Sequence, residues 1–83
     1  MDQIVRAPQQ MGSALRRIRR QRGLSQGELA ARAHLRQATI SEFEAGKGST
    51  RLDTIIAIMV ALDLEAVIRP RTSSAPEDIG KVY

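Results

Sequence analysis

The sequence LSQGELAARAHLRQATISEFEAGK, residues 24–47, predicts two short helices joined by a tight turn, and the rest of the fold is arranged around them. Ser25 and Glu28 have the spacing of a capping box, which predicts that the first helix starts here and runs for about two turns. An apolar stripe of Leu29, Ala30 and Ala33 follows at helical spacing. The small side chains of its two alanines allow another helix to approach closely.

The second helix of this stretch covers residues 37–45. It places Ile40 and Phe43 on one side, and Gly46 then provides a natural C-cap. Its apolar face is narrow and its polar face is wide. We therefore expect a surface helix that is held by two side chains and leaves the others free for external contacts.

Two further helices flank this pair. The segment 11–21 has apolar residues at helical spacing and arginines on its other face. The segment 51–62 is the most apolar part of the chain and is expected to supply the floor of the core. Thr50 and Asp53 offer a second capping-box spacing at its start. The predicted fold class is therefore all-α.

In residues 64–69, LEAVIR, the spacing of the apolar residues changes from a helical period to a period of two residues. This alternation predicts one short β-strand that stops at Pro70. A single strand cannot satisfy its own backbone hydrogen-bonding groups, so it needs a partner strand. A second copy of the chain is the simplest partner and would form a two-stranded ribbon across a dimer axis. The strand residues expected at this interface are Leu64, Ala66 and Ile68.

The 83 residues are expected to hold one small domain between two less regular ends. Residues 1–10 are interpreted as an N-terminal arm, residues 11–71 as the folded and dimerising domain, and residues 72–83 as a flexible tail. A domain of this size buries roughly 60% of the surface of its unfolded chain, so its free energy of unfolding is small. A partner subunit would increase it.

The composition excludes several classes of protein. There is no cysteine and one histidine, so disulfides and thiolate metal sites are impossible and one imidazole cannot build a metal site alone. No Gly-rich phosphate loop or carboxylate pair is present, so we expect no enzyme, no catalytic residue and no cofactor. No apolar run approaches the roughly 18 residues of a membrane span, and the first residues lack the layout of a secretory signal. We expect a cytoplasmic protein.

The positive charge is concentrated in one half of the chain. Residues 16–51 hold nine Arg and Lys against three acidic residues, whereas residues 52–83 hold three against five. A basic half of this kind favours a surface that binds a polyanion. A merely solvated, arginine-rich helix explains the charge equally well.

Two short helices with a tight turn between them, the second polar outward, are typical of the helix-turn-helix arrangement, in which the second helix enters the major groove of DNA. Such a helix presents hydrogen-bond donors, acceptors and methyl groups to base edges. Arginine can bind guanine in a bidentate manner, glutamine can bind adenine, and an alanine methyl can touch the thymine methyl. Arg36, Gln37 and Ala38 supply these three chemistries at consecutive positions.

The run LRRIRRQRGLSQGELAARAHLRQATISEFEAGK resembles the XRE-type helix-turn-helix family of phage repressors through its pattern LSQxELA and ISxFExGK. This likeness covers residues 11–62, and QATISEFE with the late strand is most similar to HipB-type antitoxins. The resemblance implies a lambda-repressor-like four-helix fold and a homodimer bound to double-stranded DNA at an inverted-repeat operator. It also implies repression of its own operon, association with the nucleoid and a HipA-like kinase toxin as partner.

The resemblance assigns roles to individual residues. Arg19 and Glu44 correspond to a structural ion pair that joins two helices and orients the recognition helix without reading DNA. The positions that match base contacts are Arg36, Gln37, Ala38 and Ser41. The positions that match phosphate contacts are Gln26, Lys47, Arg51 and Thr39, the last divided between phosphate and base.

Two departures from the family pattern affect the turn and the recognition helix. His34 stands where the family usually has glycine, and it adopts a positive φ less easily. Residues 37–45 lack a Ser, Thr, Asp or Asn N-cap, which leaves N–H groups for either a phosphate or water. Glu42 could accept a hydrogen bond from cytosine or serve as a specificity filter or a solvated side chain.

Alternative functions remain open on the sequence alone. The chain could be a free-standing phage-like or restriction-modification controller, or an interaction module that acts mainly through its tail. Tyr83 is a candidate anchor in a partner's pocket on the strength of the HipB-like resemblance, and a chain end with no role is the competing interpretation.

Overall fold

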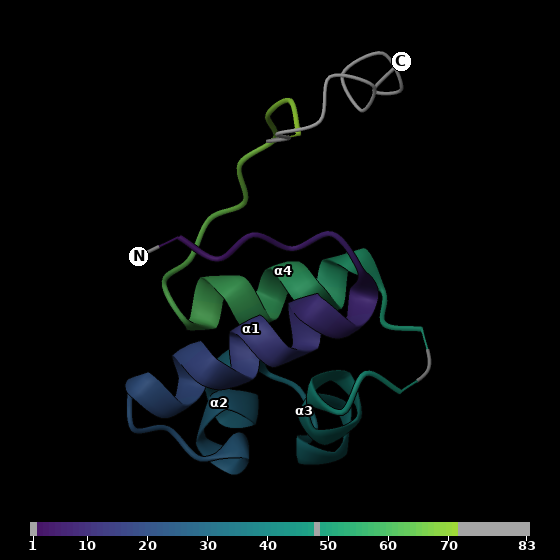
Figure 1. Cartoon of the computed structure of the whole chain (residues 1–83). Coiled ribbons are helices and arrows are strands. Elements are labelled where there is room, and N and C mark those ends of the chain that lie inside the picture. The colour runs from purple at the N-terminus through teal and green to yellow at the C-terminus, as the bar shows by residue number, and fades with distance from the viewer. Residues whose placement is uncertain (1, 48, 72–83) are drawn as a thin grey trace.

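The computed structural model describes residues 2–47 and 49–71 and contains four helices in that part of the chain. They are α1 (Pro8–Gln21), α2 (Gln26–Ala33), α3 (Gln37–Glu44) and α4 (Leu52–Ala61). Helix α1 crosses in front of α4, and α2 and α3 lie together on one side of that pair (Figure 1). The predicted all-α, four-helix class is confirmed.

Helix α1 begins three residues before the predicted start at residue 11, so residues 8–10 belong to the helix rather than to the arm. Pro8 is the reason: it occupies the first turn of the helix, where its missing N–H is not needed and its fixed φ is already helical. Ala7 precedes it in an extended conformation and gives no side-chain cap.

The core gathers apolar side chains from all four helices of the described chain. Its largest fully buried side chains are Leu29, Ile40, Ile58 and Leu62. Phe43 is 6% exposed and packs in the same cluster. The two apolar residues of α3 therefore hold that helix against the core, as its narrow apolar face predicts.

Helices α1 and α3 touch backbone to backbone at Gly12. A Cβ atom at this position would lie 2.3 Å from the carbonyl oxygen of Phe43. Real side chains do not approach so closely, so only glycine permits this contact between the two helices. Nothing in the sequence pattern indicates the contact, since Gly12 lies within an ordinary helical period.

The C-terminal ends of the four helices share one geometry. After each helix, two backbone N–H groups donate back to carbonyls of its last turn, and the residue at which the chain reverses direction has a positive φ. This is the Schellman motif, which favours glycine because a Cβ is disfavoured there. The four reversal residues are Gly23, His34, Gly46 and Asp63. His34, with φ 58°, adopts the left-handed conformation that the family usually gives to glycine.

The predicted capping box at Thr50 and Asp53 is wrong. Helix α4 begins after Arg51, which gives no side-chain cap. The carboxylate of Asp53 instead accepts two hydrogen bonds from the Arg51 guanidinium, at 3.1 and 3.2 Å. The neighbouring arginine thus engages the carboxylate that the capping box would have used.

Residues 64–71 have no regular secondary structure in the single chain. Leu64 packs against the core, whereas residues Val67 and Ile68 are 71% and 101% exposed. A strand requires hydrogen bonds to a neighbouring strand, and the described part of this chain offers none. Pairing of residues 64–69 with a second copy therefore stays a prediction. The tail, with Tyr83, lies outside the described residues.

Candidate nucleic-acid interface

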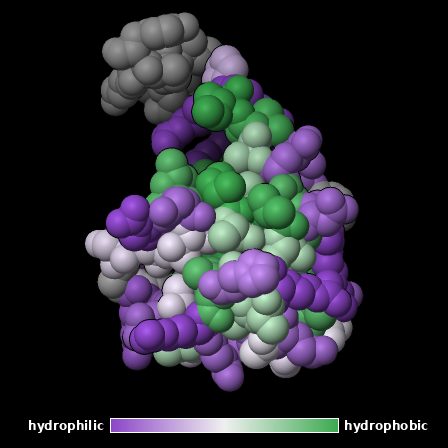
Figure 2. Space-filling view, turned by 180° about the vertical axis from the view of Figure 1, so that it is seen from behind, coloured by the Kyte–Doolittle hydropathy of each residue, from purple (hydrophilic) through white to green (hydrophobic). Residues whose placement is uncertain are grey.

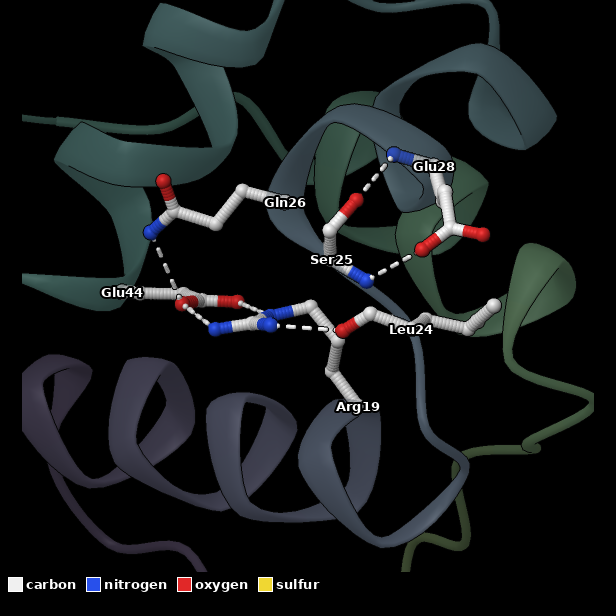
Figure 3. A network of polar contacts seen from close by, with 6 residues as sticks. All are labelled: Arg19, Leu24, Ser25, Gln26, Glu28 and Glu44. Atoms are coloured by element: carbon white, nitrogen blue, oxygen red, sulfur yellow. Dashed lines mark hydrogen bonds and ion pairs between the residues drawn. The ribbon is translucent and has the colours of Figure 1, made fainter.

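A buried ion pair joins α1 to the end of α3. Arg19 Nε donates to Glu44 Oε2 at 2.7 Å, and Arg19 Nη2 donates to Glu44 Oε1 at 2.9 Å (Figure 3). The two side chains are 8% and 3% exposed, and the hydrogen bond with Glu44 raises the pKa of Arg19 against the effect of burial. The two side chains therefore form a buried bidentate pair between α1 and α3, in the relation that the resemblance implied.

The same arginine holds the turn between α1 and α2. Arg19 Nη1 donates to the backbone oxygen of Leu24 at 2.7 Å. Buried charges are tolerated when their hydrogen-bonding capacity is met, and the described residues have no unsatisfied buried side-chain polar atom. Arg19 thereby fixes the approach of the chain to α2 as well as the position of α3.

Gln26, the first residue of α2, completes this network. Its Nε2 donates to Glu44 Oε1 at 3.2 Å, so one carboxylate contacts side chains from α1 and α2 (Figure 3). An amide nitrogen carries two hydrogens, and the bond to Glu44 uses only one of them. The sequence interpretation assigned Gln26 to phosphate contact and missed this bond, because spacing along the chain does not report contacts between distant helices.

The start of α2 is a capping box, as predicted. Ser25 Oγ accepts from the Glu28 backbone N–H at 3.0 Å, and the Ser25 backbone N–H donates to Glu28 Oε1 at 2.9 Å. Hydrogen bonds with Ser25 hold the pKa of Glu28 below its ordinary value, and the bond from the Ser25 backbone N–H has a larger effect than the bond with its hydroxyl. This box fixes the direction of the first turn of α2, where Gln26 lies.

The outer face of α3 carries the side chains expected to read bases. Gln37, Ala38 and Ser41 are exposed, while Ile40 on the opposite side is fully buried. Thr39 is half-buried between these faces. The structure thus brings three of the expected base contacts to one solvent-facing surface.

The beginning of α3 lies beside the beginning of α2. A Cβ atom at Gly27 would be 3.6 Å from Oε1 of Gln37, so the Gln37 side chain reaches the first turn of α2. Arg36 precedes α3 as an exposed N-cap residue without a side-chain cap, as predicted. The first N–H groups of α3 are therefore without a side-chain acceptor and point toward the end where Arg36 lies.

The two basic residues that follow α3 differ in their surroundings. Lys47 is exposed, and its backbone N–H closes the end of α3 by donating to Glu42 O at 3.0 Å. Arg51 forms an exposed pair with Asp53, and its hydrogen bond holds the pKa of that carboxyl below its usual value. Exposed ion pairs are weak and exchange readily, so Arg51 can leave Asp53 for another anion.

The described residues hold no cluster of three metal-ligating side chains, and none of their helices has both the length and the hydropathy of a membrane span. What remains at the surface of α2, α3 and the following loop is a set of hydrogen-bond donors around an exposed helix. That arrangement suits a polyanion with readable edges better than a small substrate.

Comparison with known proteins agrees with this geometry. The helix-turn-helix family model HTH_3 matches residues 15–67. The Antitoxin HipB of Escherichia coli strain K12 is 35% identical over 75 residues, which cover 90% of this chain and 85% of that protein.

Solved structures of HipB have the same fold. A complex of a HipB variant with an O2 20mer superposes with a TM-score of 0.78 at 35% identity, covering 83% of this chain and 96% of that one. A HipA-HipB-O2-O3 complex gives a TM-score of 0.76 at the same identity, covering 82% and 96%.

Proposed function

This chain belongs to the helix-turn-helix family and to its HipB antitoxins, and we propose that it is a sequence-specific transcriptional repressor and the antitoxin of a HipA-like kinase. The observation that carries the proposal is the exposed face of α3, held by a buried ion pair, in a chain similar to HipB over nine-tenths of its length. The HipA-HipB-O2-O3 structure supports the pairing of an antitoxin of this kind with a toxin.

In this proposal α3 enters the major groove and reads bases. Arg36 would bind guanine through two hydrogen bonds and Gln37 would bind adenine, while the Ala38 methyl meets thymine. Ser41, one turn later, can donate to or accept from a base edge. Since Ile40 and Phe43 are buried, α3 presents these side chains on a rigid support.

Phosphate contacts would position the protein on the duplex without reading its sequence. Gln26 would donate its second amide hydrogen to a phosphate while Glu44 holds the first. Thr39, Lys47 and Arg51 would contact the backbone from α3 and from the loop that follows it. Arg51 would exchange Asp53 for phosphate on binding.

A second copy would cover the exposed apolar side of α4. Leu52, Ile56 and Val60 repeat every four residues and are 72%, 42% and 70% exposed. Apolar side chains gather on the face opposite α1 (Figure 2). A contiguous apolar stripe of this kind marks an interface, and residues 64–69 of the two copies would pair beside it. The dimer would then place two α3 helices on half-sites roughly 34 Å apart, or a multiple of that distance.

Purification of the tagged protein from its native host tests the proposal, with the bound DNA sequenced and co-purifying proteins identified by mass spectrometry. We expect to recover its own promoter from nucleoid DNA together with a cytoplasmic kinase. Promoter DNA without a kinase would leave a free-standing controller. A partner without DNA would refute the assignment of α3 as a reader and leave an interaction module that acts through residues 72–83, including Tyr83.

A further inference from the structure

The outer face of α1 carries a basic ridge that the proposed operator contacts do not use. No acidic residue occurs between positions 3 and 27 of the sequence. Arg16, Arg17 and Arg20 are exposed on α1 and line a shallow hollow of about 500 Å³ with two polar neighbours, Ser13 and Gln21. We refer to Arg16, Arg17 and Arg20 as the α1 ridge.

The arginines of α1 and its end differ in their partners. Arg19 is paired with Glu44, Arg22 donates to the backbone oxygen of Leu62, and Arg17 donates to Gln3 at 2.7 Å. Arg16 and Arg20 hydrogen-bond to no carboxylate among the described residues. They lie one turn apart on the same side of the helix, with both guanidinium groups available to an external anion.

Helix α1 runs beside two of the four proposed phosphate contacts, Lys47 and Gln26. Near its start, a Cβ at Gly46 would lie 3.6 Å from Cα of Gln9, so this turn adjoins the loop that carries Lys47. Near its end, Arg19 reaches Gln26 through Glu44. The ridge therefore lies on a helix that contacts the proposed DNA-binding elements.

Helix α1 and the exposed apolar side of α4 lie on different sides of the molecule. Helix α1 crosses in front of α4 in Figure 1, and the opposite view in Figure 2 shows the apolar side over α4. If two copies join through the α4 stripe, each α1 ridge faces away from the partner. Flanking DNA reaches the ridge only if the duplex outside the two half-sites passes on that side.

We propose that the α1 ridge binds phosphates of the DNA that flanks the operator, beyond the bases that α3 reads. This inference rests on the proposed function, because it requires the operator complex. Arg16 and Arg20 are separated by about 6 Å along the helix axis, and phosphates of one strand recur about every 3.4 Å along the duplex. The planar guanidinium forks match phosphate oxygens, which favours DNA over an acidic protein as the occupant.

The test compares two duplexes that contain the same selected operator. One ends at the outer edges of the half-sites, and the other continues for about one helical turn, roughly ten base pairs, on each side. The full-length wild type is measured beside Arg16→Gln/Arg20→Gln and a control, Arg32→Gln/Arg71→Gln, which removes two exposed arginines elsewhere. Circular dichroism spectra verify that the variants keep the fold.

We expect the wild type and the control to bind the long duplex more tightly, and the ridge variant to bind both duplexes alike. If one flanking phosphate is neutralised per protomer, affinity of the wild type for the long duplex falls roughly tenfold more than for the short one between about 50 and 200 mM salt. The ridge variant should lose this extra salt dependence while keeping its affinity for the short duplex.

Three results would overturn the inference. An equal gain from the flanks in the wild type and the ridge variant would show that the ridge is not used. Equal losses on both duplexes would place the ridge inside the half-site. Loss of the kinase from a pull-down of the ridge variant, with unchanged DNA binding, would make a protein partner the occupant. If the wild type did not distinguish operator from scrambled DNA, the proposed function itself would fail.

Discussion

Glu44 and Arg19 lie 25 positions apart and meet in a bidentate ion pair with an Nε to Oε2 distance of 2.7 Å. The carboxylate also accepts from Gln26 at 3.2 Å. One side chain at the end of α3 therefore fixes the position of that helix relative to both α1 and α2. In the proposed function, this is the relation that sets the angle at which α3 meets DNA.

Breaking this pair should unfold the domain more readily. Glu44→Ala leaves the Arg19 charge buried without a partner, and we expect a loss of about 3 kcal/mol in the free energy of unfolding. Urea denaturation of the single variant and of Arg19→Met/Glu44→Leu measures it. The double variant should be the more stable of the two, since it buries no unpaired charge. A loss below about 1 kcal/mol for Glu44→Ala would show that the pair does not hold α3 in place.

Substitution of Gly12 tests the contact between α1 and α3, and the same substitution at Gly27 is the matched control. Gly12→Ala forces a methyl group against the Phe43 carbonyl, and we expect a loss of about 1 to 3 kcal/mol through displacement of the helices. Gly27→Ala meets only ordinary contacts in a helix and should be neutral or stabilising by up to about 1 kcal/mol. Thermal denaturation compares them, and equal effects would show that the close approach at Gly12 is unimportant.

Arg36 and Lys47 should affect DNA binding in different ways. Arg36→Ala removes a base contact, so it should reduce discrimination at one position by about 1 to 3 kcal/mol. Lys47→Ala removes a phosphate contact, so it should weaken operator and unrelated DNA alike and lower the slope of log K against log salt by about 1. Fluorescence anisotropy on single-base variants of the operator separates the two. An unchanged base preference in Arg36→Ala would exclude it as a reader.

The capping box at α2 predicts a specific acid dependence. The pKa of Glu28 is lower in the folded chain than its ordinary value of 4.5 because the Ser25 backbone N–H and hydroxyl bind its carboxylate. Its contribution to stability is complete above the unfolded pKa and is lost as the pH falls through the lower folded pKa. Wild type and Glu28→Gln should therefore converge in stability as the pH is lowered below the ordinary value of 4.5. A difference that stays constant from neutral pH to well below that value would refute the role of this carboxylate.

Local signals in the sequence predict much of the fold. The capping box at Ser25, the end of α3 at Gly46 and the burial of Ile40 and Phe43 depend on residues a few positions apart, and the structure confirms them. The departure at His34 is also evident from the sequence, because histidine stands where the family pattern has glycine. The structure shows that His34 adopts the positive φ of that position. These features can be predicted because backbone preference and side-chain period are local properties.

The features that sequence patterns miss depend on contacts between distant segments or on competing neighbours. The bond from Gln26 to Glu44 and the close approach at Gly12 join separate helices. The capping box expected at Thr50 fails because the N-cap of α4 is Arg51, one residue later, so Asp53 is not at the third helical position. The predicted start of α1 is too late because a proline near a chain end fits an irregular arm as well as a first helical turn. The residues assigned to bases and phosphates remain predictions.

Dimeric, sequence-specific operator recognition by α3 is best tested by selecting binding sites from a random duplex library with the purified full-length protein. We expect enrichment of an inverted repeat whose half-site centres are one helical turn, roughly 34 Å, or a multiple of it apart. The preference at one base position in each half-site should disappear with Arg36→Ala. A library that stays random after selection, or enrichment of a single site without two-fold symmetry, would be incompatible with a dimeric, sequence-specific repressor.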